Sequence, residues 1–216
     1  MLRYTLVTEG SSDTALMPII DWVLRENGIV EPIHGEWADL GEVSFLEKIN
    51  LGIKVREAIR LYPCDLLFVH RDADRSSRHE RVAEIEFAIE SASSQISIPA
   101  AVCVIPIRML EAWLLFDELA IRYAAANRNG LIPLEIPLLK NVEELPDPKY
   151  VLYALIKQAS GLSGRRLKRL RVNQCTRRVT EFVEDFSPLR ELFAFSTFEH
   201  DIQCILDQIH RESRQT

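Results

Sequence analysis

Short apolar segments alternate with amphipathic helical segments over the N-terminal half of the chain. The apolar segments have the length and the β-branched content of buried strands, and they cover residues 2–8, 29–38, 65–70 and 99–106. Apolar residues at helical spacing predict the intervening helices, from Ser11 or Ser12 to about residue 27 and then over residues 44–61, 76–91 and 109–116. Strands that alternate with helices form a mostly parallel sheet with helices on both faces. The sequence therefore predicts an α/β fold.

The alternation stops after about residue 120. No convincing strand follows, and prolines interrupt the next segment, at Pro133, Pro137, Pro146 and Pro148. Apolar periodicity predicts helices over residues 148–160, 165–185 and 197–212. We therefore expect an α/β domain over residues 1–120. Residues 121–216 are expected to form a loop and helical C-terminal appendage packed on the sheet domain.

Composition narrows the class of protein. The chain has 216 residues and 47% hydrophobic content, which is ample for one core. No apolar run approaches the roughly 20 residues of a membrane span. Glu9 interrupts the one early apolar stretch, so no signal peptide is expected either. The four cysteines form no C-x-x-C pair, which argues against a zinc site and a disulfide framework and favours a reducing cytoplasm.

Acidic residues follow two of the predicted strands. Glu9 ends the first strand, and Asp13 lies in the first turn of the next helix. Asp72 and Asp74 follow the strand over residues 65–70, at a spacing that allows both to project the same way. The carboxyl ends of parallel strands meet at the edge of a sheet where ligands bind. Gathered carboxylates repel one another unless a cation lies between them, and Mg²⁺ takes such oxygen ligands. For Asp13 alone, a favourable contact with the helix dipole is an alternative explanation.

These acidic motifs resemble those of a Toprim domain. That family has a glutamate after its first strand, here in Glu9-Gly10-x-x-Asp13, and an Asp-x-Asp after a later strand, here Asp72 and Asp74. It includes topoisomerases, bacterial primases, recombination mediators, small ribonucleases and the nuclease half of OLD-family proteins. The resemblance covers roughly residues 1–117. It implies one or two Mg²⁺ or Mn²⁺ ions, with Glu9, Asp72 and Asp74 as catalytic residues and Asp13 as a further metal ligand.

Two more residues resemble parts of OLD-like Toprim nucleases. Glu111 follows the fourth predicted strand, as does the acid that contributes to a second metal position in those proteins. Lys149 begins a predicted helix and resembles the catalytic lysine that they supply from beyond the core acids. Alternatively, Glu111 is an ordinary first-turn acid and Lys149 a solvent-exposed lysine. Some relatives accompany an ATPase in phage defence, so the resemblance also implies a separate ATPase as a partner.

One segment is strongly basic although the chain has a formal net charge of -6. Residues 164–178 contain seven basic residues and no acidic one. Phosphate backbones bind such clusters, so nucleic acid is the expected partner. The expected contacts are Arg165, Arg166, Lys168, Arg169 and Arg171. The alternative is a solvated helix face.

Other side chains are weaker candidates for the chemistry. Arg71, Arg75 and Arg108 lie near the predicted acids and could contact a phosphate in the transition state. His70 and His34 could act as general bases, although a histidine in a strand is more often a hydrogen-bonded core residue.

Together these features predict a divalent-metal-dependent nuclease that hydrolyses nucleic-acid phosphodiesters, DNA rather than RNA, in DNA processing or phage defence. The alternative is a non-catalytic Toprim-like binding or regulatory partner of a separate ATPase. A primase-like role ranks third, because the chain has no obvious template-binding module.

Overall fold

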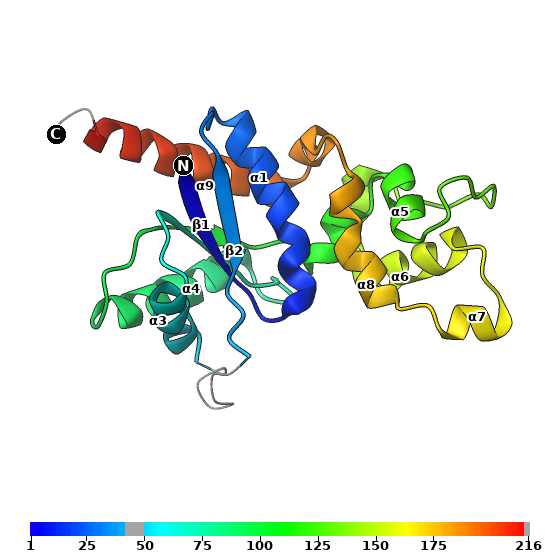
Figure 1. Ribbon diagram of the computed structural model, residues 1–216, viewed down its shortest axis with the longest axis horizontal. Helices are drawn as coiled ribbons and strands as arrows, with labels where there is room; N and C mark the ends of the chain where they lie inside the picture. The colour runs from blue at the N-terminus through cyan, green and yellow to red at the C-terminus, as the bar shows by residue number, and fades with distance from the viewer. Residues whose placement is uncertain (42–49, 214–216) are drawn as a thin grey trace. The chain divides into compact units, whose positions relative to one another are not determined.

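The computed structural model describes residues 1–41 and 50–213 (Figure 1). Contacts divide the chain into two units. The first comprises Met1–Ser11, Val23–Ile105 and Thr197–Thr216, and the second comprises Ser12–Trp22 and Pro106–Ser196. This division differs from the predicted boundary at residue 120, because residues 12–22 and 106–120 belong to the second unit and the end of the chain returns to the unit that contains the sheet.

The first unit contains a four-stranded sheet in which every pairing is parallel. Its strands are β1 (Leu2–Val7), β2 (Ile33–Trp37), β3 (Leu66–His70) and β4 (Ala100–Val104), in the order β2-β1-β3-β4. In register, Val7 lies beside Val69, so β1 and β3 end at the same edge of the sheet. The predicted α/β fold with a parallel sheet is confirmed.

Helices α3 (Leu51–Leu61) and α4 (Arg78–Ser93) cover one face of this sheet (Figure 1). Val55 of α3 and Ile85 of α4 are fully buried in one apolar cluster with Leu67 and Val69 of β3. A capping box at Ser77 fixes the start of α4. The part of the predicted helix 44–61 that precedes residue 50 lies outside the described residues.

Helix α9 comprises Phe193–Ser213, and from Thr197 onward it belongs to the first unit. This part of α9 covers the opposite face of the sheet (Figure 1). Phe68 of β3 is fully buried, and its ring lies edge-on to Tyr4 at 5.3 Å and to Phe198 of α9 at 6.2 Å. Helices therefore lie on both faces of the sheet, as predicted.

The second unit is built from short helices, and its described residues contain no strand. Fully buried Trp113 packs edge-on against Phe195 at 5.2 Å. The elements of this unit are η1 (Ser11–Ala15), α1 (Leu16–Glu26), η2 (Leu110–Leu114), α5 (Glu118–Ala124), η3 (Leu139–Glu144), α6 (Pro148–Ala159), α7 (Gly164–Lys168), α8 (Val172–Arg178), η4 (Thr180–Phe182) and η5 (Ser187–Glu191). The first residue of η1 and the part of α1 from Val23 onward belong to the first unit. The helix predicted over residues 109–116 is a shorter 3₁₀-helix.

The helix predicted over residues 165–185 is interrupted, which corrects that prediction. Helix α7 ends at Lys168 and α8 begins at Val172, with Arg171 in a non-helical conformation between them. Like charges three and four positions apart destabilise a helix, and Arg165, Lys168 and Arg169 stand at these spacings.

Among the described helices, none combines the length and the apolar character needed to cross a membrane.

Candidate functional site

Three of the predicted acids lie at the carboxyl edge of the sheet, in the first unit. Glu9 follows β1 after one intervening residue, and Asp72 and Asp74 follow the adjacent strand β3. Parallel pairing without a register shift is what places these strand ends side by side. These acids therefore lie at one sheet edge, as predicted.

Two arginines pair with acids at this edge. Arg71 forms ion pairs with Glu9 and, at 3.0 Å, with Glu84 of α4. Arg81 pairs with the other oxygen of Glu84 at 2.7 Å and with Asp74 at 3.2 Å. The hydrogen bond to Glu84 raises the pKa of the Arg81 guanidinium above its ordinary value. We call these five side chains the edge network, in which Glu84 joins the two arginines.

Asp72 has a different neighbour. Its Oδ1 lies 3.4 Å from Nε2 of His70, which is almost completely buried in β3. Asp74 has φ 52°, a left-handed conformation that aspartate tolerates better than most residues. The strand ends at His70, so the alternation that would have aimed Asp72 and Asp74 the same way does not continue. The two aspartates therefore contact different partners.

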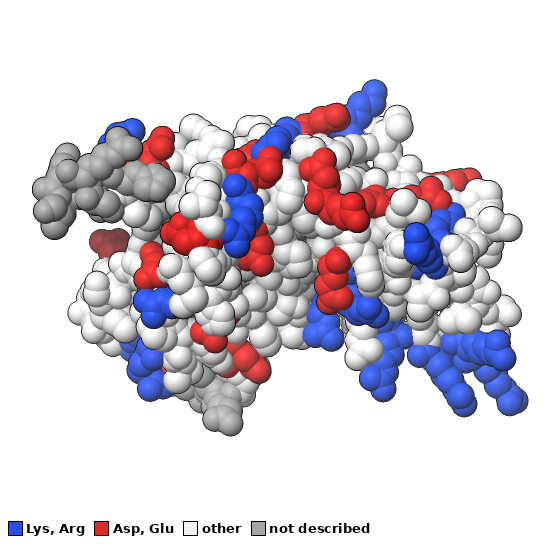
Figure 2. All heavy atoms as spheres, turned by 45° about the horizontal axis from the view of Figure 1, so that its top comes forward, with Lys and Arg blue, Asp and Glu red and all other residues white. Residues whose placement is uncertain are grey.

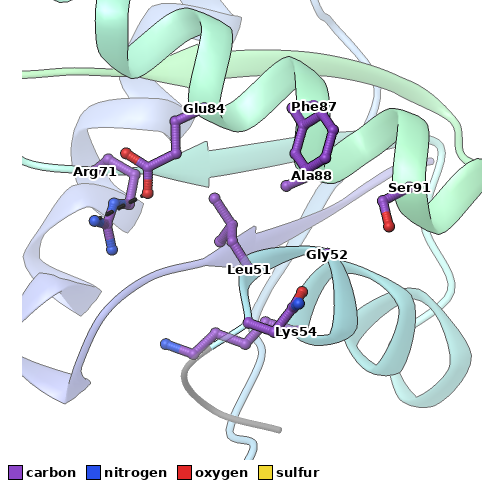
Figure 3. A pocket seen from close by; sticks show the side chains of 9 residues that line it. Leu51, Gly52, Lys54, Arg71, Glu84, Phe87, Ala88 and Ser91 are labelled. Carbon is purple, nitrogen blue, oxygen red and sulfur yellow. Dashed lines mark ion pairs between the residues drawn. The ribbon is translucent and has the colours of Figure 1, made fainter.

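A pocket of about 290 Å³ lies between α3 and α4 beside the edge network (Figure 3). Arg71 and Glu84 point toward each other at one end of it, and Lys54 of α3 extends toward the same end. Gly52 allows the two helices to approach closely, because a Cβ there would lie 3.1 Å from the Ala88 carbonyl oxygen. Arg71 and Lys54 thus line a pocket that was not predicted from the sequence.

In the second unit, Glu111 and Lys149 come together. Glu111 lies in η2 and is buried, with a side-chain exposure of 7%, and its Oε1 is 3.2 Å from Nζ of Lys149. Asp147 caps α6 by accepting a hydrogen bond from the Tyr150 amide, which places Lys149 in the first turn as predicted. Burial raises the pKa of the neighbouring Tyr153, partly offset by Lys149. Glu111 is therefore a buried, paired carboxylate.

Three other candidates lie outside the edge network. Asp13 lies in η1 and accepts a hydrogen bond from Ser12 Oγ at 2.9 Å. His34 is exposed and lies 3.7 Å from Glu36. Arg108 belongs to the second unit and has φ 63°, a strained conformation for an arginine.

The described residues do not contain a group of three or more His, Cys, Asp or Glu side chains close enough to hold one metal ion. The donor chemistry at the sheet edge suits a hard cation, since Glu9, Asp72 and Asp74 supply carboxylate oxygens. Their present arrangement pairs Glu9 and Asp74 with guanidinium groups instead. A cation would fit only by replacing Arg71 and Arg81 as partner of these acids.

The basic segment forms a dense surface on α7 and α8 (Figure 2). Its five predicted contact residues are all exposed: Arg165, Arg166, Lys168, Arg169 and Arg171. In residues 1–41 and 50–213, none of these five side chains forms an ion pair. Cations this close together repel one another, so a polyanion would stabilise them.

Sequence reasoning missed Arg81 and Glu84. The signal was present, because Arg81 and Glu84 are three residues apart in a helix that begins four positions after Asp74, and such pairs face the same way. Arg81 and Glu84 connect the two acidic motifs through Arg71.

Comparison with known proteins gives no match to a family model, a curated protein or a solved structure. The resemblance to Toprim domains therefore rests on the two motifs and on their place at the carboxyl edge of a parallel sheet.

Proposed function

We propose that the protein is a cytoplasmic, divalent-metal-dependent nuclease that hydrolyses nucleic-acid phosphodiesters, DNA rather than RNA. The observation that carries this proposal is the placement of Glu9 and of Asp72 and Asp74 at the ends of adjacent parallel strands. Acids from two strands at one edge form an oxygen-rich site of the kind that Mg²⁺ or Mn²⁺ binds.

Glu9, Asp72 and Asp74 would hold the metal, which when bound supplies an activated water and neutralises charge on the attacked phosphate. Arg71 and Arg81 would give up their carboxylate partners and remain beside the site as cations. In the described chain, the Nε atom of each is buried and has no hydrogen-bond acceptor. Guanidinium groups bind phosphate oxygens well, so both arginines are suited to hold the scissile phosphate.

The exposed cations of α7 and α8 support nucleic acid as the substrate. They supply contacts to the backbone that do not depend on sequence, and binding through them weakens as salt rises.

The proposal is tested by following cleavage of linear, supercoiled and single-stranded DNA and of RNA with Mn²⁺, alongside calorimetric titration of Mn²⁺. Wild type is compared with Glu9→Gln and Asp72→Asn. Asp65→Asn is the matched control, because Asp65 is an exposed acid that precedes β3 and pairs with Arg3 at 3.0 Å. We expect the first two variants to lose metal binding and cleavage and the control to keep both. Cleavage by well-folded Glu9→Gln and Asp72→Asn at the wild-type rate contradicts the proposal.

A second candidate function is a non-catalytic binding module that acts with a separate ATPase, for example in phage defence. The edge network favours it, because Arg71 and Arg81 already pair with Glu9 and Asp74, two of the three acids that a metal would need. Metal-independent nucleic-acid binding without cleavage, in all the variants above, is the result expected from this candidate.

A further inference from the structure

A second concave surface lies in the second unit, between the end of α5 and the helices α7 and α8. This pocket has a volume of about 380 Å³. Four arginines line it, two from or beside α7 and two from or beside α8: Arg166, Arg169, Arg171 and Arg178. Small side chains at the end of α5, including Ala125 and Ala126, also line it.

The charge in this pocket is one-sided. Of the described residues that line it, none is an aspartate or a glutamate. Arg178 pairs with Glu181 at 3.2 Å, whereas Arg166, Arg169 and Arg171 have no ion-pair partner in the described chain. Burial raises the pKa of the Cys175 thiol, so this lining residue is neutral at pH 7 and adds no negative charge.

An aromatic stack holds the guanidinium of Arg178 in place. The rings of Tyr123 and Phe182 stack with centroids 5.2 Å apart. Arg178 lies over the Phe182 ring at 5.1 Å, and Arg128 lies over the Tyr123 ring at 5.0 Å. Contacts of this kind restrict a long side chain, so at least one cation of the pocket is positioned before any ligand arrives.

We propose that this pocket binds the terminal phosphate of a nucleic-acid strand. A phosphodiester within a strand carries one negative charge, whereas a terminal monoester carries about −1.5 to −2 at pH 7 and presents three acceptor oxygens. Several guanidinium groups that line one pocket match the monoester better, because each can donate two hydrogen bonds to phosphate oxygens. A strand end can also enter a concave site that a continuous duplex backbone would pass over. Nucleic acid as the source of this phosphate rests on the proposed function.

The test is fluorescence anisotropy of the full chain with short single-stranded oligonucleotides that carry a 5′-phosphate, a 3′-phosphate or hydroxyl groups at both ends. EDTA is present, so the result does not depend on cleavage. We expect one of the phosphorylated forms to bind at least about tenfold more tightly than the hydroxyl form, which corresponds to about 1.4 kcal/mol. Arg169→Gln should abolish this preference, and Arg166→Gln is a second variant should the first fail to fold.

Arg165→Gln is the matched control, because Arg165 is an exposed arginine of α7 that does not line the pocket. It should weaken binding of all three oligonucleotides equally and leave the preference intact. Equal affinity of wild type for all three forms overturns the inference while leaving nucleic-acid binding in place, and so does a preference that Arg165→Gln and Arg169→Gln reduce equally. If no oligonucleotide binds at low salt, the proposal that α7 and α8 bind nucleic acid is overturned. The inference about the pocket is then overturned as well, because it rests on that proposal.

Discussion

The pair formed by Glu111 and Lys149 offers a quantitative test of what these side chains do. Their charged atoms lie 3.2 Å apart, which gives an attraction of about 5 kcal/mol at an effective dielectric constant of about 20 and about 1 kcal/mol in bulk water. Glu111 is 7% exposed but Lys149 is 46% exposed, so solvent screens the pair substantially. We therefore expect a coupling energy near the lower value, at about 1–2 kcal/mol.

The assay is a double-mutant cycle with Lys149→Met, Glu111→Gln and the double variant, in which urea unfolding gives the free energy of unfolding of each. Lys149→Met should be the most destabilising single change, by about 2 kcal/mol, because it leaves a buried carboxylate without its cation. Adding Glu111→Gln should restore part of that loss.

A coupling energy below about 0.5 kcal/mol would refute the inference that this pair stabilises the second unit, because it lies in the lower part of the range of about 0.2–1 kcal/mol found for exposed pairs. A catalytic role for Lys149 makes a separate prediction. Lys149→Met would then lower the cleavage rate at temperatures where the variant is still fully folded.

Three further changes test other parts of the structure. Phe68→Ala should lower the free energy of unfolding by about 3–5 kcal/mol, measured in urea, because a fully buried ring is removed. The Cys103 thiol, whose pKa burial raises to about 11, should react with an alkylating reagent at pH 8 far more slowly than exposed Cys204, as peptide mapping would show. The hydrogen bond and ion pair with Arg3 lower the pKa of Asp65, so its stabilising effect exists above the unfolded pKa and disappears as pH falls through the folded one. Urea midpoints of wild type and Asp65→Asn should therefore differ at pH 7 and converge as the pH falls through the lowered pKa of folded Asp65.

The sheet was predictable because its strands are nearly continuous apolar segments. Leu66, Leu67, Phe68 and Val69 are all fully buried, as a central parallel strand requires, and such a run leaves little choice of structure. The interruption of the helix predicted over residues 165–185 could not be predicted. Apolar spacing continues through this segment and favours one helix, whereas repulsion between neighbouring arginines destabilises it.

The site was predictable at the level of the sheet edge and not at the level of its contacts. Position after a strand places Glu9 and Asp74 at that edge, but it does not say which cation neutralises them. Here Arg71 pairs directly with Glu9 and Arg81 pairs directly with Asp74. Glu84 joins the two arginines, and its distance in sequence from Glu9 hides the connection. The left-handed backbone at Asp74 was equally hidden, because no glycine marks the turn.

The return of α9 to the sheet has a consequence for synthesis of the chain on the ribosome. Phe68 and the sheet face around it are made early, but Phe198, which packs against that face, follows only after residues 106–196. At about 5–20 residues per second, that face waits roughly 5–20 s for the helix that covers it. A nascent chain at this stage exposes one apolar face of a parallel sheet. The yield of folded protein should therefore depend on chaperones. The dependence should be greater than for a protein whose sheet is covered on both faces before the next unit is made.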